Sequence, residues 1–319
     1  MVLAALRQHL PDAPSWSAIR KILRARRITI GGVLCIDEGR QLSRGEVVVV
    51  LDQPLPPPPK DEDVKIVHVD AALVVAEKPS GMVSLRRRAD QNWSWDRKNQ
   101  QPTLDECVAR LIASHKQKGR RTQPLPPLYP VHRIDRDTSG LLVFARHTEV
   151  QANLIQQFAQ HESVRKYLAL IPGSIEDQTI KSYLVRDRGD GLRGSSDQTG
   201  DGQLAITHIR TLKLLGQRPD GPKSTGKLSE LECRLETGRT NQIRIHLAEL
   251  GHPICGDIKY RNAFGEEPIE DHSQIRRLAL HAAELNFQHP RTQKPMSFQS
   301  AWPLDIQRYL KWLEKQSQG

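Results

Sequence analysis

Short apolar runs separated by turn residues dominate the chain, and most of them predict strands rather than helices. A helix is predicted at 104–112, where Leu104, Val108, Leu111 and Ile112 share one helical face. Helices and strands do not alternate strictly, as they would along a parallel sheet. The pattern therefore predicts an α+β fold with a mixed, mainly antiparallel sheet. Strand-like runs occur at 64–76, 140–145, 167–171, 204–212, 231–235 and 278–287.

A proline-rich segment divides the chain. The prolines at 54 and 56–59 favour an extended spacer, because polyproline fits neither a core helix nor a sheet. We therefore expect a small α+β domain at 1–53, a linker at 54–63 and a larger domain at 64–319. The small domain is predicted to contain a helix at 16–26, strands at 28–30 and 47–51, and a turn at Gly31-Gly32.

The net charge of the chain indicates which classes of molecule it can bind. The 319 residues include 47 Lys and Arg against 37 Asp and Glu, a formal charge of +10, which favours RNA, DNA or an anionic lipid. No segment approaches the roughly 18 apolar residues of a membrane span, and the apolar stretch at 2–6 is too short for a secretory signal. We expect a cytoplasmic protein that does not associate with membranes. Four widely spaced cysteines predict reduced packing residues.

On the predicted helix at 16–26, basic side chains surround an apolar face that is formed by Ile19, Ile22 and Leu23. Such a cluster is either a solvated face or a surface for a polyanion. With the following strand, the glycine turn and the stretch LSRGE at 42–46, it resembles the alpha-L RNA-binding module of a small-subunit ribosomal protein and several RNA-modifying enzymes. The resemblance covers about residues 3–52. It implies RNA contacts by the basic residues of the helix, Arg20, Lys21, Arg24, Arg26 and Arg27.

The segment HRIDRDTSGLL at 132–142 places charged residues directly before an apolar strand, where side chains are held rigidly and still reach a cleft. It resembles HRLDxxTSGLL, the signature of RluA-type pseudouridine synthases. Further segments resemble motifs of this family in the same order, and the resemblance spans about residues 65–303. These segments are EKPSG at 77–81, RKYLAL at 165–170, GRTNQIRIH at 238–246, GHPI at 251–254, GD at 256–257, LHA at 280–282 and HP at 289–290.

The resemblance implies a pseudouridine synthase, an isomerase that modifies specific uridines of ribosomal RNA, with transfer RNA as an alternative substrate. The reaction breaks the bond between uracil and ribose, rotates the base and bonds carbon 5 to the sugar. It uses no redox step, no ATP and no metal, so we expect no cofactor. It requires an ionised carboxylate, a flat surface for the base, a cation and a dry pocket. RNA is the expected partner, and the protein is expected to be a monomer.

The motif positions imply a role for each candidate site residue. Asp135 is the catalytic carboxylate, and Arg244 is the cation that keeps it charged. Tyr167 stacks on the target base and offers its hydroxyl for the late proton transfer at carbon 5. Attack of the carboxylate on the anomeric carbon and removal of a ribose proton both remain open. Arg133 corresponds to the residue that fills the space left by the extruded base, and Arg165 replaces a family lysine and keeps its positive charge beside the tyrosine. Both arginines are expected to contact the RNA.

A second hypothesis is a catalytically silent RNA-binding or ribosome-assembly factor on the same scaffold. It is kept open by Asn241, which replaces a family histidine in a motif where a change could alter substrate preference or reduce activity. The presence of Asp135, Tyr167 and Arg244 argues against it, because a silent paralogue has no physical reason to retain all three.

A third hypothesis uses Asp135 and Asp137 as the acid and base of an inverting glycosidase. On an extended backbone these residues share a face with a separation of about 6.6 Å. Arg133 and Arg136 argue against this pair, because they would keep both carboxylates ionised. His132 is expected to be a hydrogen-bonded structural residue, since the histidines show neither HxxEH nor HExxH spacing.

Overall fold

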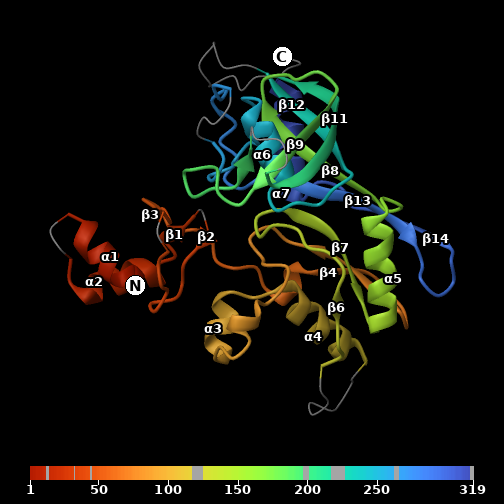
Figure 1. Ribbon diagram of the computed structural model, residues 1–319, viewed down its shortest axis with the longest axis horizontal. Coiled ribbons are helices and arrows are strands. Elements are labelled where there is room, and N and C mark those ends of the chain that lie inside the picture. Colours follow the sequence, from red (N-terminus) through yellow and green to blue (C-terminus); the bar gives the residue numbers. More distant parts are fainter. Residues whose placement is uncertain are drawn as a thin grey trace. The chain divides into compact units, whose positions relative to one another are not determined.

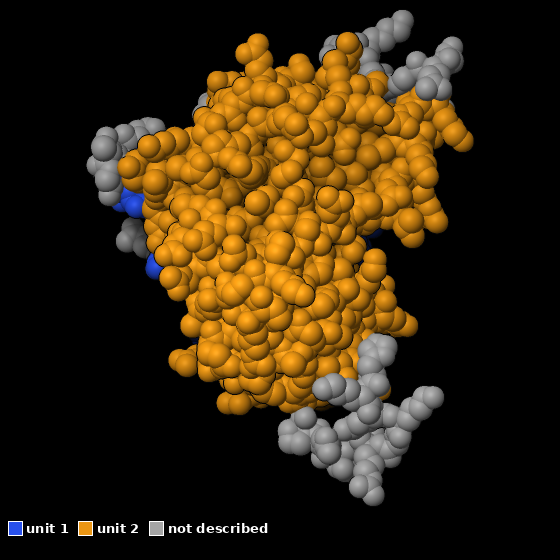
Figure 2. All heavy atoms as spheres, turned by 90° about the vertical axis from the view of Figure 1, so that its right-hand side faces the viewer, with its two compact units in different colours: residues 1–57, 184–202 blue, residues 58–183, 203–319 orange. Residues whose placement is uncertain are grey.

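The computed structural model describes residues 1–11, 14–31, 33–43, 45–116, 125–196, 201–216, 227–261 and 266–316. The chain forms two compact units, residues 1–57 with 184–202 and residues 58–183 with 203–319 (Figure 2). The first unit thus includes a segment, 184–202, that the sequence assigned to the larger domain. Among the described residues, no helix is long and apolar enough to cross a membrane.

Two short helices and a three-stranded antiparallel sheet form the N-terminal part of the first unit. The Ser15 hydroxyl caps the second helix by accepting a hydrogen bond from the Ala18 amide at 3.2 Å. Ile19 and Leu23 are buried in the core of this unit, as their spacing predicted. The strands lie in the order β2-β1-β3. The elements are α1 (Val2–His9), α2 (Trp16–Arg24), β1 (Ile28–Ile30), β2 (Val33–Leu34) and β3 (Val48–Val50).

Helix α2 ends two residues before the predicted boundary. Arg26 has a φ of 60°, a left-handed conformation that stops the helix. The chain then enters β1, and the Arg27 Nε donates to the Leu51 carbonyl just beyond β3 at 2.6 Å. Part of the basic cluster therefore holds the unit together. Gly32 of the predicted turn lies outside the described residues.

The second unit is built on a large sheet with the strand order β9-β11-β12-β8-β13-β7-β5-β4, while β14 pairs with β13 and β6 with β7 (Figure 1). The short strand β10, at 194–195 in the first unit, pairs with residues 184–185 at the end of β9, which belong to the same unit. The β13–β7 pair is parallel, whereas β4–β5, β5–β7, β6–β7, β8–β12, β8–β13, β11–β12 and β13–β14 are antiparallel. The prediction of an α+β fold with a mixed, mainly antiparallel sheet is confirmed.

The predicted strands and the predicted helix at 104–112 are all present. The strands are β4 (Lys65–Val69), β5 (Leu73–Lys78), β6 (Tyr129–Pro130), β7 (Ser139–Ala145), β8 (Val164–Pro172), β9 (Gln178–Val185), β10 (Gly194–Ser195), β11 (Gln203–Leu215), β12 (Leu228–Leu235), β13 (Leu280–Gln288) and β14 (Pro295–Gln299). The helices are α3 (Trp95–Gln100), α4 (Leu104–Lys116), α5 (Thr148–Ala159), α6 (Gln242–Glu249) and α7 (Leu304–Gln316). None of the four cysteines forms a disulfide and all are buried, as predicted.

Strand β7 is buried along its whole length because both of its faces are covered. Leu142 and Phe144 belong to a core cluster that includes α4, whereas Leu141 and Val143 belong to a second cluster that includes α5. Burial of each such side chain contributes about 1.5–3 kcal/mol. The loop that precedes β7 is therefore attached to one of the most firmly packed strands of the unit.

The KPSG stretch supports this loop by hydrogen bonds to its backbone. The buried Lys78 ammonium donates to three backbone carbonyls, one of which belongs to Arg136 at 2.8 Å. Burial lowers the pKa of Lys78 to about 7, while three carbonyl acceptors match the three N–H groups of the protonated form. The Ser84 hydroxyl donates to the Ile134 carbonyl at 2.6 Å. The backbone on both sides of Asp135 is therefore fixed.

Asp70 organises the turn between β4 and β5. One carboxylate oxygen accepts hydrogen bonds from the amides of Ala72 and Leu73 at 2.6 and 2.9 Å. The other lies 2.8 Å from His68 Nε2 and 3.2 Å from His289 Nε2. Burial raises the pKa of this carboxyl, but these hydrogen bonds outweigh burial and lower the pKa to about 2.

We predict that Asp70→Asn lowers the melting temperature at pH 7, and that the difference from wild type shrinks as the pH falls from about 4 to about 2. The folded-state pKa is below the ordinary value of 3.8, so the ionised carboxylate stabilises the fold above that value and the contribution is lost on acidification. Melting temperatures across this pH range test it, with the exposed Asp52→Asn as the control. A difference that does not vary with pH would contradict the prediction.

Candidate active site

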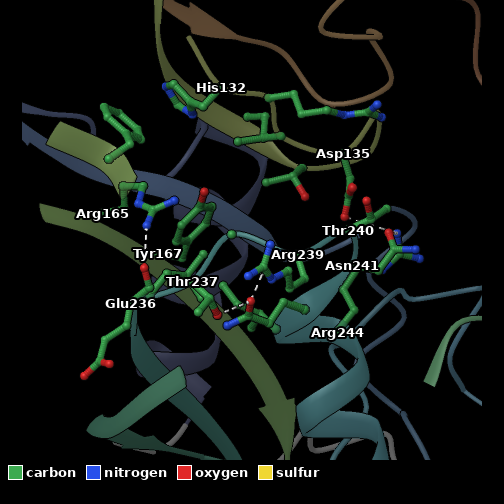
Figure 3. A pocket seen from close by; sticks show the side chains of 18 of the residues that line it. His132, Asp135, Arg165, Tyr167, Glu236, Thr237, Arg239, Thr240, Asn241 and Arg244 are labelled. Carbon is green, nitrogen blue, oxygen red and sulfur yellow. Dashed lines mark hydrogen bonds and ion pairs between the residues drawn. The ribbon is translucent and has the colours of Figure 1, made fainter. Parts of the chain in front are cut away.

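A pocket of about 680 Å³ opens in the second unit. Three parts of the chain supply most of its lining, and Leu204 of β11 and Leu280 of β13 complete it. The three parts are the loop before β7, the segment from the end of α5 into β8, and the segment from the end of β12 into α6 (Figure 3). Asp135, Tyr167 and Arg244, which the sequence separates by up to 109 positions, contribute one from each part. The fold thus brings together the three residues to which the sequence assigned the chemistry.

Asp135 lies at the pocket wall with 19% of its side chain exposed. Its Oδ2 is 3.8 Å from Arg244 Nη1. Burial raises the pKa of the Asp135 carboxyl, and the charges of Arg244, Arg133 and Lys259 oppose that rise. A carboxylate in this position is partly desolvated and lies close to cations that favour its ionised form.

Arg244 has a second and closer partner, to which the sequence analysis assigned no role. Its Nε and Nη2 donate to the two carboxylate oxygens of Asp257 at 2.7 and 2.8 Å, and both side chains are buried. Burial raises the pKa of Asp257, but the Arg244 charge and hydrogen bonds lower it below its ordinary value. Asp257 therefore fixes the plane of the guanidinium, while Nη1 remains directed toward Asp135. The sequence feature that could have indicated a role for Asp257 was the GD motif at 256–257.

Asn241 takes part in the same network. It caps the N-terminus of α6 in a left-handed conformation, with a φ of 61°, which asparagine tolerates better than most residues. Its side-chain amide donates to the Tyr260 hydroxyl at 3.0 Å, and its carbonyl accepts from Arg244 Nη1 at 3.3 Å. Asparagine thus supplies both a donor and an acceptor where the family pattern has histidine, and the Arg244 position is preserved.

Tyr167 lies on β8 at the pocket and is 7% exposed. Burial raises the pKa of its hydroxyl to about 12, against the opposing charge of Arg165. The side chain is therefore protonated at neutral pH. An aromatic ring in the wall of an open pocket can stack on a planar base.

The remaining predicted residues differ in their environments. Arg133 is exposed at the pocket, whereas Arg165 is buried in its wall. His132 Nε2 accepts a hydrogen bond from the Val143 amide at 3.2 Å, and burial lowers the pKa of the ring to about 3. The hydrogen bond predicted for His132 is therefore present, and the ring also lines the pocket. The five basic residues of the N-terminal helix region, Arg20, Lys21, Arg24, Arg26 and Arg27, belong to the first unit.

The glycosidase hypothesis is not supported by this geometry. The residues 131–138 do not form an extended strand. Asp137 does not line the pocket and is paired with the Arg136 guanidinium at 2.9 and 3.2 Å. Among the described residues, no group of three or more His, Cys, Asp and Glu side chains is placed to hold a metal.

Comparisons with known proteins agree with the site. A model of the family described as RNA pseudouridylate synthase matches residues 72–249. The tRNA pseudouridine synthase C of Vibrio cholerae is 32% identical over 239 residues, which are 73% of this chain and 88% of that protein. The ribosomal large subunit pseudouridine synthase D of Zymomonas mobilis is 34% identical over 269 residues, covering 82% and 78%. The chain belongs to the RNA pseudouridylate synthase family and is an isomerase that acts on RNA.

Solved structures support the fold assignment. The human RNA Pseudouridylate Synthase Domain Containing 1 matches with a TM-score of 0.55 and 22% identity, over 77% of this chain and 86% of that one. At this identity the likeness concerns the fold alone. The sheet and helices described above are therefore those of a pseudouridine synthase fold.

The paired geometry predicts that Asp257→Asn destabilises the protein by about 3–5 kcal/mol, because it removes one charge of a buried ion pair. Urea unfolding of wild type and variant measures this loss. The matched control is Asp305→Asn, whose carboxylate pairs with Arg277 but is 57% exposed; an exposed pair contributes about 0–1 kcal/mol. Equal losses in the two variants would contradict the role given to Asp257.

Proposed function

We propose that Asp135 is the catalytic carboxylate, that Arg244 keeps it ionised, and that Tyr167 holds the target base. The observation that carries the proposal is the convergence of these three side chains in one pocket, from three separate parts of the second unit. Both routes that the sequence left open, attack on the anomeric carbon and removal of a ribose proton, need an ionised carboxylate at the ribose. Arg244, with Nη1 at 3.8 Å, favours that state.

The uracil of the target uridine would be held by other residues than its ribose. Stacking on the Tyr167 ring would hold the uracil after the bond to ribose is broken and while it rotates. The Tyr167 hydroxyl, whose pKa is raised to about 12 by burial, enters the reaction protonated. Arg133 is exposed at the pocket, where it can fill the place that the extruded uridine leaves in the RNA.

Ribosomal RNA is the substrate that we propose, acted on by a monomer. The relative that covers 82% of this chain is named as a large-subunit ribosomal RNA enzyme, while another relative is named as a transfer RNA enzyme. The N-terminal resemblance to a ribosomal protein favours the first substrate. The test is to map pseudouridine in total RNA from cells with and without the gene. Loss of a transfer RNA site with no loss in ribosomal RNA would overturn the substrate assignment. The cytoplasmic location stays a prediction.

Asp135→Asn is expected to abolish pseudouridine formation while RNA affinity stays within about threefold, because the change removes charge with little change of shape. Release of tritium from carbon 5 of labelled RNA measures the reaction, and filter binding measures affinity. The matched control is Asp137→Asn in the same loop, which lies outside the pocket lining and should retain activity. Turnover by purified Asp135→Asn would show that another group carries the chemistry.

We also propose that residues 1–53 form an RNA-binding domain, 54–63 a linker and 64–319 the catalytic domain. Arg20, Lys21 and Arg24 are exposed on α2, and Glu38 pairs with two of them. Arg26 and Arg27 donate to backbone carbonyls of their own unit. The surface for phosphate is therefore carried mainly by the three residues of the helix.

Changing Arg20, Lys21 and Arg24 together to Gln should weaken RNA binding and reduce the slope of log affinity against log salt by about two, at roughly 0.7–0.9 per lost phosphate contact. The rate at saturating RNA should be unchanged. Binding titrations at several salt concentrations test this on the full chain. A triple change of the exposed Arg308, Lys311 and Lys315 on α7 is the charge-matched control. Equal slopes for the two triple variants would refute the module assignment.

A further inference from the structure

Arg165 is a buried cation whose hydrogen-bonding capacity is mostly unused. It is 8% exposed, lines the pocket and has five N–H donors. Among the described residues it makes one hydrogen bond, from Nη2 to the Glu236 carbonyl at 2.8 Å, and no ion pair. Its Nε is buried and has no partner. Arg244, the other arginine buried in this pocket, faces two carboxylates.

The surroundings of Arg165 hold the guanidinium in place without neutralising it. Its carbon Cζ lies 5.2 Å from the centre of the Phe158 ring. A Cβ atom at Gly238 would come within 2.7 Å of Nη1, so the glycine leaves the space that the guanidinium occupies. Burial lowers the pKa of Arg165. An unpaired charge at a buried site is unfavourable in the free protein, which points to a ligand group that completes the site.

The pocket places Arg165 on the opposite side of Tyr167 from Asp135. Arg165 and Tyr167 are two residues apart on β8, so they project from the same face of the sheet. The charges of both Arg165 and Asp135 act on Tyr167, whereas the cations that act on Asp135 are Arg244, Arg133 and Lys259. Figure 3 shows the order Asp135, Tyr167, Arg165 across the pocket.

A uracil stacked on Tyr167 with its ribose at Asp135 directs N1 toward Asp135 and O4 toward Arg165. When the bond from C1′ to N1 breaks, its electron pair stays with the base, and the negative charge is shared by N1, O2 and O4. The new bond from C1′ then forms with an electron pair of the ring at C5, C5 loses its proton and N1 gains one. The charge on O4 is therefore present only between the two bond changes.

We propose that Arg165 donates a hydrogen bond to O4 of the detached uracil and stabilises its negative charge. This assignment rests on the proposed function. A phosphate of the RNA is the other anion that the substrate brings, but phosphodiesters continue to neighbouring nucleotides and stay at the mouth of the pocket. Burial of Arg165 favours the base. A donor that meets charge only as the reaction proceeds contributes to the rate rather than to the affinity.

The first test compares Arg165→Met with the control Lys166→Met. Lys166 is the next residue of β8, and its ammonium pairs with Glu232 and Glu284, so the control also removes one positive charge. In single-turnover reactions with saturating RNA, Arg165→Met should be slower by about 10²–10³-fold, as for loss of one oxyanion donor. Its RNA affinity should stay within about threefold. Lys166→Met should keep the wild-type rate, and Arg165→Lys should recover most of it.

Melting temperature separates this role from a structural one. Removal of an unpaired buried charge should leave the melting temperature of Arg165→Met equal to that of wild type or higher. A fall in melting temperature together with a fall in rate and affinity would show that Arg165 supports the fold, and would overturn the assignment. A normal rate at saturating RNA with weakened affinity would indicate a phosphate contact and would also overturn it.

The second test changes the substrate instead of the protein. The uridine identified by mapping is placed in a short synthetic RNA as 4-thiouridine or, as the matched control, 2-thiouridine. Sulfur is a poorer acceptor, so 4-thiouridine should slow wild type and Arg165→Lys about tenfold more than it slows Arg165→Met, which has no donor to lose, and 2-thiouridine should slow all three alike. Equal effects of the two analogues would refute the contact to O4. Absence of pseudouridine with wild type and unmodified RNA would refute the proposed function itself, and this assignment with it.

Discussion

Arg244 is buried between two carboxylates, and the pocket depends on how its charge is divided between them. Asp257 takes the two short contacts at 2.7 and 2.8 Å, while Asp135 lies at 3.8 Å. A carboxylate held in a tight bidentate pair would be ionised, but its oxygens would be occupied. Because Asp257 takes most of the hydrogen bonds of the guanidinium, Asp135 gains the nearby positive charge and its oxygens remain open to the pocket.

The positions of Asp257 and Asp135 beside Arg244 depend on backbone features that lie outside the pocket lining. Gly256 has a φ of 73°, and a Cβ there would come within 2.1 Å of the Arg277 carbonyl, so the turn that presents Asp257 needs glycine. On the other side, the Lys78 ammonium and the Ser84 hydroxyl hold the carbonyls of the Asp135 loop. The KPSG and GD motifs thus help to fix the positions of the two carboxylates that face Arg244.

The sequence predicted the strands from their local apolar pattern, and its motifs singled out Asp135, Tyr167 and Arg244, which the fold brings together in one pocket. It did not predict α6, since Ile243 and Ile245 alternate with polar residues as in a strand, and all residues from Gln242 to Ala248 are buried, which removes the amphipathic signal of a helix. It gave Asp257 no role because the pair with Arg244 bridges 13 positions. Arg165 was expected to contact RNA as a positive charge beside Tyr167, and its spacing of two from Tyr167 on a strand agrees with its place in the pocket wall.

The pocket therefore contains a fixed positive field on both sides of a neutral aromatic ring. Arg244, Arg133 and Lys259 act on Asp135 at one side, and Arg165 lies at the other without a carboxylate partner among the described residues. In water such charges would be screened, but in a pocket closed by a base they act at a low effective dielectric. For Arg165, the cost of burying a charge without a carboxylate partner among the described residues is met when the protein folds. Under the mechanism proposed above, this field favours the state of the substrate that carries the most negative charge, which is the detached base.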